Sequence, residues 1–228
     1  MGFKKVKSPV RILSTKKLQP NQKQFLLNAG FSVIETDFIS IRDKYFTFSN
    51  INDNLIFTSQ NAVKAVANHP DVQEIRRNPV FCVGERTADL LDELGFTVQE
   101  SAENAAALAK IMTTDYVSES FTFFSGNLRM ETLPEQLKVA GIDYNEIEVY
   151  ETILMPKRIE TPVEGILFFS PSAVESYLQA NTITNEMCFC IGKTTAEALE
   201  KITQDIIIAN HPTVENVIIQ CLNHYSKK

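Results

Sequence analysis

Residues Ile56–Val63 read IFTSQNAV, and residues Leu167–Val174 read LFFSPSAV. In both stretches an apolar run ends at a hydroxyl residue and continues into Ala-Val, which is typical of a buried strand that turns directly into a helix. A second pair follows in the same order: Cys82–Ala88 reads CVGERTA and Cys190–Ala196 reads CIGKTTA. Because both pairs lie about 110 residues apart, the sequence predicts an internal duplication of one structural unit.

The alternation of strand-like and helical patterns continues through both repeats. Such alternation is typical of parallel sheets with helices on both faces. We therefore predict an α/β fold of two parallel-sheet domains, in which the loops leaving the strand carboxyl ends gather on one edge. The other matching segments are Ser101–Asn104 with Thr213–Asn216, and Ser14 with Ala29 and Gly30 against Ser125 with Ala140 and Gly141.

Two strand-like segments interrupt this alternation and indicate where the domains are joined. Asp37–Arg42 and Glu148–Thr152 follow the equivalent Ala-Gly turns of the two repeats. We interpret them as crossings, so that the chain leaves its first domain, builds the second and then returns. The expected organisation is a discontinuous domain 1 (1–36 and 156–228), a domain 2 (40–149), a two-stranded connector (37–42 and 148–155), and a ligand site in the cleft between the domains.

The composition is that of a globular intracellular protein. Apolar residues make up 44% and charged residues 22% of the 228 residues. No apolar run reaches the roughly 18 residues of a membrane helix, and the N-terminal stretch MGFKKVKSPVRIL has no apolar signal-peptide core. Cys82, Cys188, Cys190 and Cys221 form no C-x-x-C pair, which favours buried, reduced thiols. We expect a cytoplasmic protein that does not associate with membranes.

Charge and motif content disfavour several function classes. The net charge is −6 and no long Lys/Arg block is present, which disfavours nucleic acid as a partner. The histidines have no ligand spacing, so we expect no metal site. P-loop, Rossmann and G-x-S-x-G patterns are absent, which leaves nucleotide binding and esterase chemistry without support. An anionic ligand stays open, because helix N-termini hold anions without net positive charge.

Hydroxyl residues and glycines recur at the predicted carboxyl-end edge in both repeats. Residues 58–59 and 170–172 end a strand and open a helix, and residues 84–87 and 192–195 form glycine-containing turns. Together with residues 125–126, they give an edge rich in neutral hydrogen-bond donors. Such an edge suits a large ligand with several carboxylates. Each serine taken alone fits a plain helix N-cap equally well.

No conventional catalytic set is visible among these turns. Arg129 and Glu131 follow at helical spacing and are typical of a solvated ion pair. Tyr150 lies on a proposed crossing strand, which borders the expected cleft. A half-buried structural tyrosine fits the same position.

The order of these motifs resembles the uroporphyrinogen-III synthase family over almost the whole chain. F-T-S-x-N-A-V is followed by V-G-x-x-T-A, S-G-N-x-x-x-x-x-L, V-Y-E-T, F-S-P-S-A-V and I-G-K-T-T-A. The resemblance implies a monomeric, cofactor-free and metal-free lyase of haem biosynthesis. Its substrate would be hydroxymethylbilane, a linear tetrapyrrole with eight carboxylates, which is cyclised to uroporphyrinogen III with loss of water and inversion of the terminal ring.

By position, the resemblance also assigns roles to individual residues. Tyr150 would be the catalytic proton donor. Lys16 stands where many members have arginine, and it replaces the charge but not the bidentate geometry. The positions implied for substrate binding are Thr58, Ser59, Thr87, Ser125, Gly126, Ser170, Ser172, Thr194 and Thr195.

Two non-catalytic functions remain as alternatives. One is a two-domain protein that closes on a small anion, although the missing signal-peptide pattern disfavours a periplasmic receptor. The other is a regulatory homologue that binds a tetrapyrrole without converting it. The sequence does not separate this homologue from the enzyme.

Overall fold

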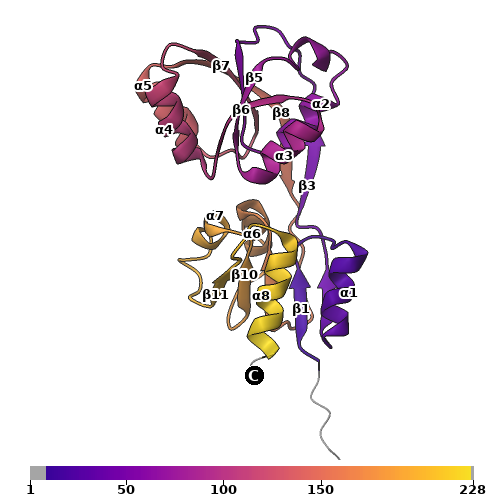
Figure 1. The fold of residues 1–228 in the computed structure, drawn as a ribbon. Helices are drawn as coiled ribbons and strands as arrows, with labels where there is room; N and C mark the ends of the chain where they lie inside the picture. The colour runs from indigo at the N-terminus through magenta and orange to yellow at the C-terminus, as the bar shows by residue number, and fades with distance from the viewer. Residues whose placement is uncertain (1–8, 227–228) are drawn as a thin grey trace, which may run out of the picture. The chain divides into compact units, whose positions relative to one another are not determined.

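The structure, a computed structural model, describes residues 9–226. The chain divides into two compact units (Figure 1). One contains the chain up to Ser40 and again from Ile153 onwards, and the other runs from Ile41 to Thr152. Each unit holds its own sheet of mainly parallel strands, so the predicted α/β fold class is confirmed.

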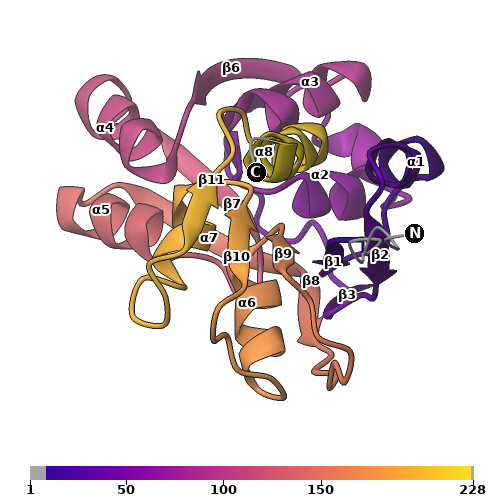
Figure 2. The same ribbon diagram turned by 90° about the horizontal axis from the view of Figure 1, so that it is seen from below.

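The first unit is a parallel sheet with helices on both faces. Its described elements are β1 (Arg11–Ser14), α1 (Pro20–Asn28), β2 (Ser32–Glu35), β9 (Gly165–Phe168), α6 (Pro171–Leu178), β10 (Met187–Cys190), α7 (Lys193–Glu197), β11 (Ile206–Ile208) and α8 (Val214–Ser226). The strand order is β11-β10-β9-β1-β2, and all pairs are parallel. Figure 2 shows α1 and α8 on one face and α6 on the other. Ile12 packs on the α1/α8 side and Leu13 on the α6/α7 side, because successive strand residues point to opposite faces.

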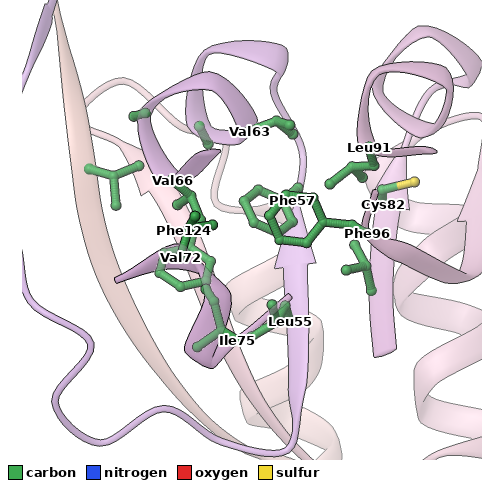
Figure 3. Packing of buried hydrophobic residues seen from close by; sticks show 14 residues of the cluster. Leu55, Phe57, Val63, Val66, Val72, Ile75, Cys82, Leu91, Phe96 and Phe124 are labelled. Carbon is green, nitrogen blue, oxygen red and sulfur yellow. The ribbon is translucent and has the colours of Figure 1, made fainter. Parts of the chain in front are cut away.

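The second unit repeats this architecture. Its elements are β4 (Asn54–Phe57), α2 (Gln60–Ala67), a 3-10 turn η1 (Val72–Glu74), β5 (Pro79–Val83), α3 (Glu85–Glu93), β6 (Thr97–Ala102), α4 (Ala105–Asp115), β7 (Ser120–Gly126) and α5 (Thr132–Ala140), with β3 (Ile39–Asp43) and β8 (Asp143–Leu154) at one edge. The strand order is β3-β8-β7-β4-β5-β6. One face carries α2 and α3, and the other carries α4 and α5. On the α2/α3 face, Phe57 and Phe124 stack with ring centroids 5.2 Å apart and fix β4 to β7 (Figure 3).

The sheet orders show the duplication predicted from the sequence. Strands β2-β1-β9-β10-β11 of the first unit correspond in order to β8-β7-β4-β5-β6 of the second. The chain enters the common unit at different points, because the first unit begins with β1, the strand beside the central strand β9, whereas β4, the first of the common strands in the second unit, is the central one. This difference makes the first unit discontinuous in sequence.

One detail of the predicted repeat is wrong. Ser14 pairs with Leu167, whereas Ile56, the repeat equivalent of Leu167, pairs with Phe123. In the register of the sheets Ser14 therefore corresponds to Phe123, two residues before Ser125. The cause is strand length, since β7 has seven residues and β1 has four.

The two segments that carry the chain from one unit to the other lie side by side as β3 and β8. Lys44 N–H donates to Val149 O (3.0 Å), and Met155 N–H donates to Phe38 O (2.8 Å). From the first of these bonds to the second, the residue number falls on the β3 side and rises on the β8 side, so the two strands are antiparallel. β8 is one strand of 12 residues, longer than the strand expected at 148–152. Between residues 9 and 226, no helix is long and apolar enough to cross a membrane.

Candidate functional site

Each sheet has, beside its central strand, a point at its carboxyl-end edge where neighbouring strands lead to helices on opposite faces. In the first unit this switch point lies between β1, which leads to α1, and β9, which leads to α6. In the second unit it lies between β7, which leads to α5, and β4, which leads to α2. Crevices at such points are where open α/β sheets bind their ligands.

At the switch point of the second unit, Ser59 caps α2 and accepts two hydrogen bonds. Its Oγ accepts from the Asn61 N–H at 3.1 Å and from the Tyr150 hydroxyl at 3.1 Å. A hydroxyl oxygen has two acceptor lone pairs and one hydrogen. Ser59 thus uses both lone pairs within the protein and keeps its own hydrogen for a further acceptor.

Tyr150 reaches Ser59 because its ring lies directly over Gly126. Ser125 is paired with Glu148, but Gly126 is paired with Tyr150, so Val149 is an extra residue on β8. Such a bulge redirects the side chains that follow it. A Cβ added to Gly126 would lie 2.3 Å from the Tyr150 Cζ, which is too close for any side chain. The Tyr150 ring therefore leaves no room for a side chain at position 126, which explains why this residue is glycine.

A charged cluster lies beside this point, around an opening of about 360 Å³ that Gly126 and Asn127 also line. Arg129 Nη2 donates to Glu146 Oε2 at 2.9 Å, and its Nη1 lies 2.6 Å from Glu131 Oε1. Burial by itself would raise the pKa of Glu146, but hydrogen bonds from Arg129 and Ser125 outweigh it and lower the pKa. Arg129 pairs as expected with Glu131 and also with Glu146, so its charge is compensated within the unit.

The first unit presents hydroxyls and a lysine at the equivalent point. Ser170 caps α6, accepting from the Ala173 N–H at 3.1 Å, and its Oγ lies 3.0 Å from the Ser172 Oγ. Phe169 directly precedes Ser170 in the chain, and the Lys16 ammonium lies 5.5 Å from the centroid of the Phe169 ring. The structure thus brings together the expected residues Ser170 and Ser172. Lys16 contacts Phe169, the residue before Ser170.

The two glycine turns differ from each other. Gly84 has φ 89°, a conformation that favours glycine, and it opens α3, whereas Gly192 is extended at φ −169° and opens α7, a helix of five residues. Thr87 and Thr195 are only 5% and 1% exposed. Thr194 is exposed, and Thr58 is half-buried at the end of β4. Ser125 is also buried, at 2% exposed, and hydrogen-bonds to Glu146, so three of the expected hydroxyls are covered by their own unit.

The cysteines are buried and unpaired, as expected. Burial raises the pKa of Cys188, Cys190 and Cys221 to about 12, and burial also raises the pKa of Cys82. These thiols are protonated at neutral pH and act as small apolar core residues. Among residues 9–226, no cluster of His, Cys, Asp and Glu could hold a metal ion.

Comparisons with known proteins agree with this arrangement. A sequence model described as Uroporphyrinogen-III synthase HemD matches residues 23–219. The uroporphyrinogen-III synthase of Chlorobaculum parvum is 27% identical over 177 residues, which cover 67% of this chain and 72% of that protein.

Solved structures show the same fold at low sequence identity. Uroporphyrinogen-III synthetase from Helicobacter pylori aligns with a TM-score of 0.70 and 20% identity, over 94% of this chain and 99% of that one. A mutant uroporphyrinogen III synthase from Thermus thermophilus aligns with a TM-score of 0.73 and 12% identity, over 96% and 100% of the two chains. The sequence match, which spans most of the protein, confirms the resemblance seen in the motifs. The chain belongs to the uroporphyrinogen-III synthase family.

Proposed function

We propose that this protein closes hydroxymethylbilane to uroporphyrinogen III, with Tyr150 as the proton donor at the switch point of the second unit. Family membership makes the protein a cyclising lyase of haem biosynthesis. The observation that supports the proposed site is the Tyr150–Ser59 hydrogen bond above Gly126. This phenol hydroxyl lies at the carboxyl-end edge of the sheet, and such edges are where open α/β sheets bind ligands.

The chemistry requires a proton because hydroxide is a poor leaving group. When the C–O bond of the hydroxymethyl group breaks, a donated proton turns the departing oxygen into water. Phenols titrate near pH 10 and stay protonated at neutral pH, and they are far stronger acids than serine or threonine hydroxyls. Tyr150 donates to Ser59 in the free protein, so its proton reaches the substrate after the hydroxyl rotates or by way of Ser59.

Carboxylate binding is proposed for hydroxyls and backbone N–H groups of both switch points. Ser59 keeps one hydrogen to donate, and Ser170 and Ser172 share one hydrogen between them and keep the other. Thr87, Ser125 and Thr195 are covered, so their hydroxyls reach a ligand only if the chain around them moves. The proposed set remains Thr58, Ser59, Thr87, Ser125, Gly126, Ser170, Ser172, Thr194 and Thr195.

The protein is further proposed to act in the cytoplasm as a monomer, without a nucleic-acid or membrane partner. The net charge of −6 supports the lack of a nucleic-acid partner. Tetrapyrrole closure needs one substrate molecule, and the proposed donor and its acceptor come from one chain.

The test is incubation of the purified protein with freshly prepared hydroxymethylbilane, followed by separation of the product isomers. The free substrate cyclises slowly to the uninverted isomer, so the inverted isomer is the signature of the enzyme. We expect the inverted isomer to dominate in proportion to the protein added. Tight binding of the substrate with only the uninverted product would instead identify a regulatory homologue.

A further inference from the structure

We infer that Asn127 is a positioning residue that holds Tyr150 in place, an inference that rests on the role proposed for Tyr150. The Asn127 carboxamide bonds to both backbone groups of Thr152, two residues beyond Tyr150 on β8. Asn127 Oδ1 accepts from the Thr152 N–H at 2.7 Å, and its Nδ2 donates to the Thr152 carbonyl at 3.3 Å. One side chain thus pairs with a strand residue as a neighbouring strand would.

β8 needs this partner because β7 stops short of it. β7 ends at Gly126, whereas β8 continues to Leu154. Beyond Gly126 the backbone groups of β8 on that side have lost the strand that paired with them, and unpaired backbone groups cost free energy. The bulge at Val149 has already interrupted the ladder immediately before Tyr150. Asn127 is the residue that restores pairing after the interruption.

The loop that follows β7 also bonds to β8 at a residue before Tyr150. Arg129 donates two hydrogen bonds to the carboxylate of Glu146 through its Nε and Nη2. The segment 127–129 is therefore tied to β8 before Tyr150, at Glu146, and after it, at Thr152. With Gly126 below the ring and Ser59 accepting from the hydroxyl, this arrangement fixes where the phenol points.

The test is a double-mutant cycle that combines Asn127→Ala with Tyr150→Phe. Asn127→Ala removes two hydrogen bonds, and we expect kcat to fall about 10-fold, with KM changed less than about twofold. In the Tyr150→Phe background, Asn127→Ala should cause no further loss of kcat, because it acts only through the phenol. Equal losses in both backgrounds would overturn the inference. Asn127→Asp keeps the acceptor for the Thr152 N–H and should recover part of kcat; it also replaces Asn127→Ala in the cycle if that variant does not fold.

Asn145→Ala is the matched control, because Asn145 ties the opposite end of the same strand. Its Oδ1 accepts from the Thr122 hydroxyl at 2.8 Å, and its Nδ2 donates to the Asn50 carbonyl at 2.8 Å. We expect this variant to lower the melting temperature without changing kcat. If it lowers kcat as much as Asn127→Ala does, the effect is a general weakening of β8 and the inference fails.

A second measurement does not depend on activity. NMR of protein labelled with ¹³C-tyrosine reports the ring of Tyr150, whose signals are assigned by their loss in Tyr150→Phe. We expect these signals to shift or broaden in Asn127→Ala and to stay unchanged in Asn145→Ala. Unchanged Tyr150 signals in Asn127→Ala would overturn the inference, even if the wild type converted no substrate and the proposed function had failed by itself.

Discussion

The strand pair β7/β8 of the second unit continues past the point at which the corresponding pair of the first unit, β1/β2, stops. β7 and β8 have 7 and 12 residues, whereas β1 and β2 have 4 each. The additional length places Tyr150 beside the N-cap serine Ser59. In the first unit the corresponding N-cap serine, Ser170, has Ser172 as its partner instead.

The duplication has thus kept a serine at the start of the helix and changed the group that bonds to it. A phenol donates a proton far more readily than an aliphatic hydroxyl does. In the proposed function, the second unit supplies both the acid and hydroxyls that bind carboxylates, and the first unit supplies such hydroxyls alone. Substitutions at corresponding positions of the two units therefore test this difference.

The largest effect is expected from Tyr150→Phe. The change removes the proposed donor while keeping the ring over Gly126, so the fold and substrate binding should persist. General acid catalysis contributes about 10²–10⁴-fold and the substrate also loses its hydroxyl unaided, so we expect the rate to fall by about 10- to 1000-fold. The residual enzymatic product should still be the inverted isomer, measured after subtraction of the spontaneous background.

The matched control is Tyr177→Phe in the first unit. Tyr177 is buried against Phe38 and Phe168, and burial raises its pKa to about 12. This variant should turn over at the wild-type rate. A wild-type rate for Tyr150→Phe as well would mean that Tyr150 is structural, and a slow variant making mostly the uninverted isomer would mean that it positions the ring.

Gly126→Ala should have the next largest effect. Its Cβ would occupy the place of the Tyr150 ring, so either the ring or the backbone must move. Overpacking of this kind costs about 1–3 kcal/mol of stability, and we expect kcat to fall together with the melting temperature. Tyr150→Ala in the same chain should restore the melting temperature but not kcat, because it removes the clash together with the acid.

Gly192→Ala in the first unit is the control for replacing a glycine at the sheet edge where no clash arises; Gly192 corresponds in the repeat to Gly84 and not to Gly126. No atom lies within 4 Å of a Cβ at this glycine, and its extended backbone suits any residue. A change of only a few tenths of a kcal/mol is expected in chemical denaturation. A large loss in Gly192→Ala would show that replacing a glycine at this edge is costly without any clash, and the tyrosine ring would then not be needed to explain the cost at Gly126.

The sequence was sufficient for the features that local patterns determine. Apolar runs followed by hydroxyl or glycine turns predicted the parallel sheets and the duplication, because both depend on periodicity along the chain. The N-cap roles of Ser59 and Ser170 follow from the same local pattern.

Features that depend on pairing between distant strands were not predictable in this way. The bulge at Val149 and the contact of Tyr150 with Gly126 arise from register, which leaves no local trace in sequence. The role of Asn127 was missed for the same reason. One signal was available: Glu35 and Glu146 stand at the same distance after the two Ala-Gly turns, and each accepts a hydrogen bond from the loop that follows β1 or β7.

Ser59→Ala and Ser170→Ala compare the two N-caps directly. Each loses a cap, so each should lower stability by about 0.5–2 kcal/mol. Each also loses one proposed carboxylate donor, which should raise KM by about 2- to 10-fold. Only Ser59→Ala removes the acceptor of the Tyr150 hydroxyl, so only this variant should also lower kcat. Equal kcat losses in both variants, measured by steady-state kinetics, would contradict the difference between the units.

The smallest effect concerns the Glu146–Arg129 pair and its dependence on pH. Because the pKa of Glu146 is lowered in the folded protein, its ionised form stabilises the fold above the ordinary glutamate pKa of about 4.3, and this contribution is lost as the pH falls through the lowered value. Glu146→Gln should melt about 2 °C below the wild type at pH 7, as expected for a partly exposed pair worth up to about 1 kcal/mol. This gap should close as the pH approaches 3.

Glu131→Gln is the control, since the Glu131 side chain is 65% exposed and should contribute little at any pH. A gap for Glu146→Gln that stays constant from pH 7 to pH 3 would mean that the carboxylate acts by packing and not by its charge.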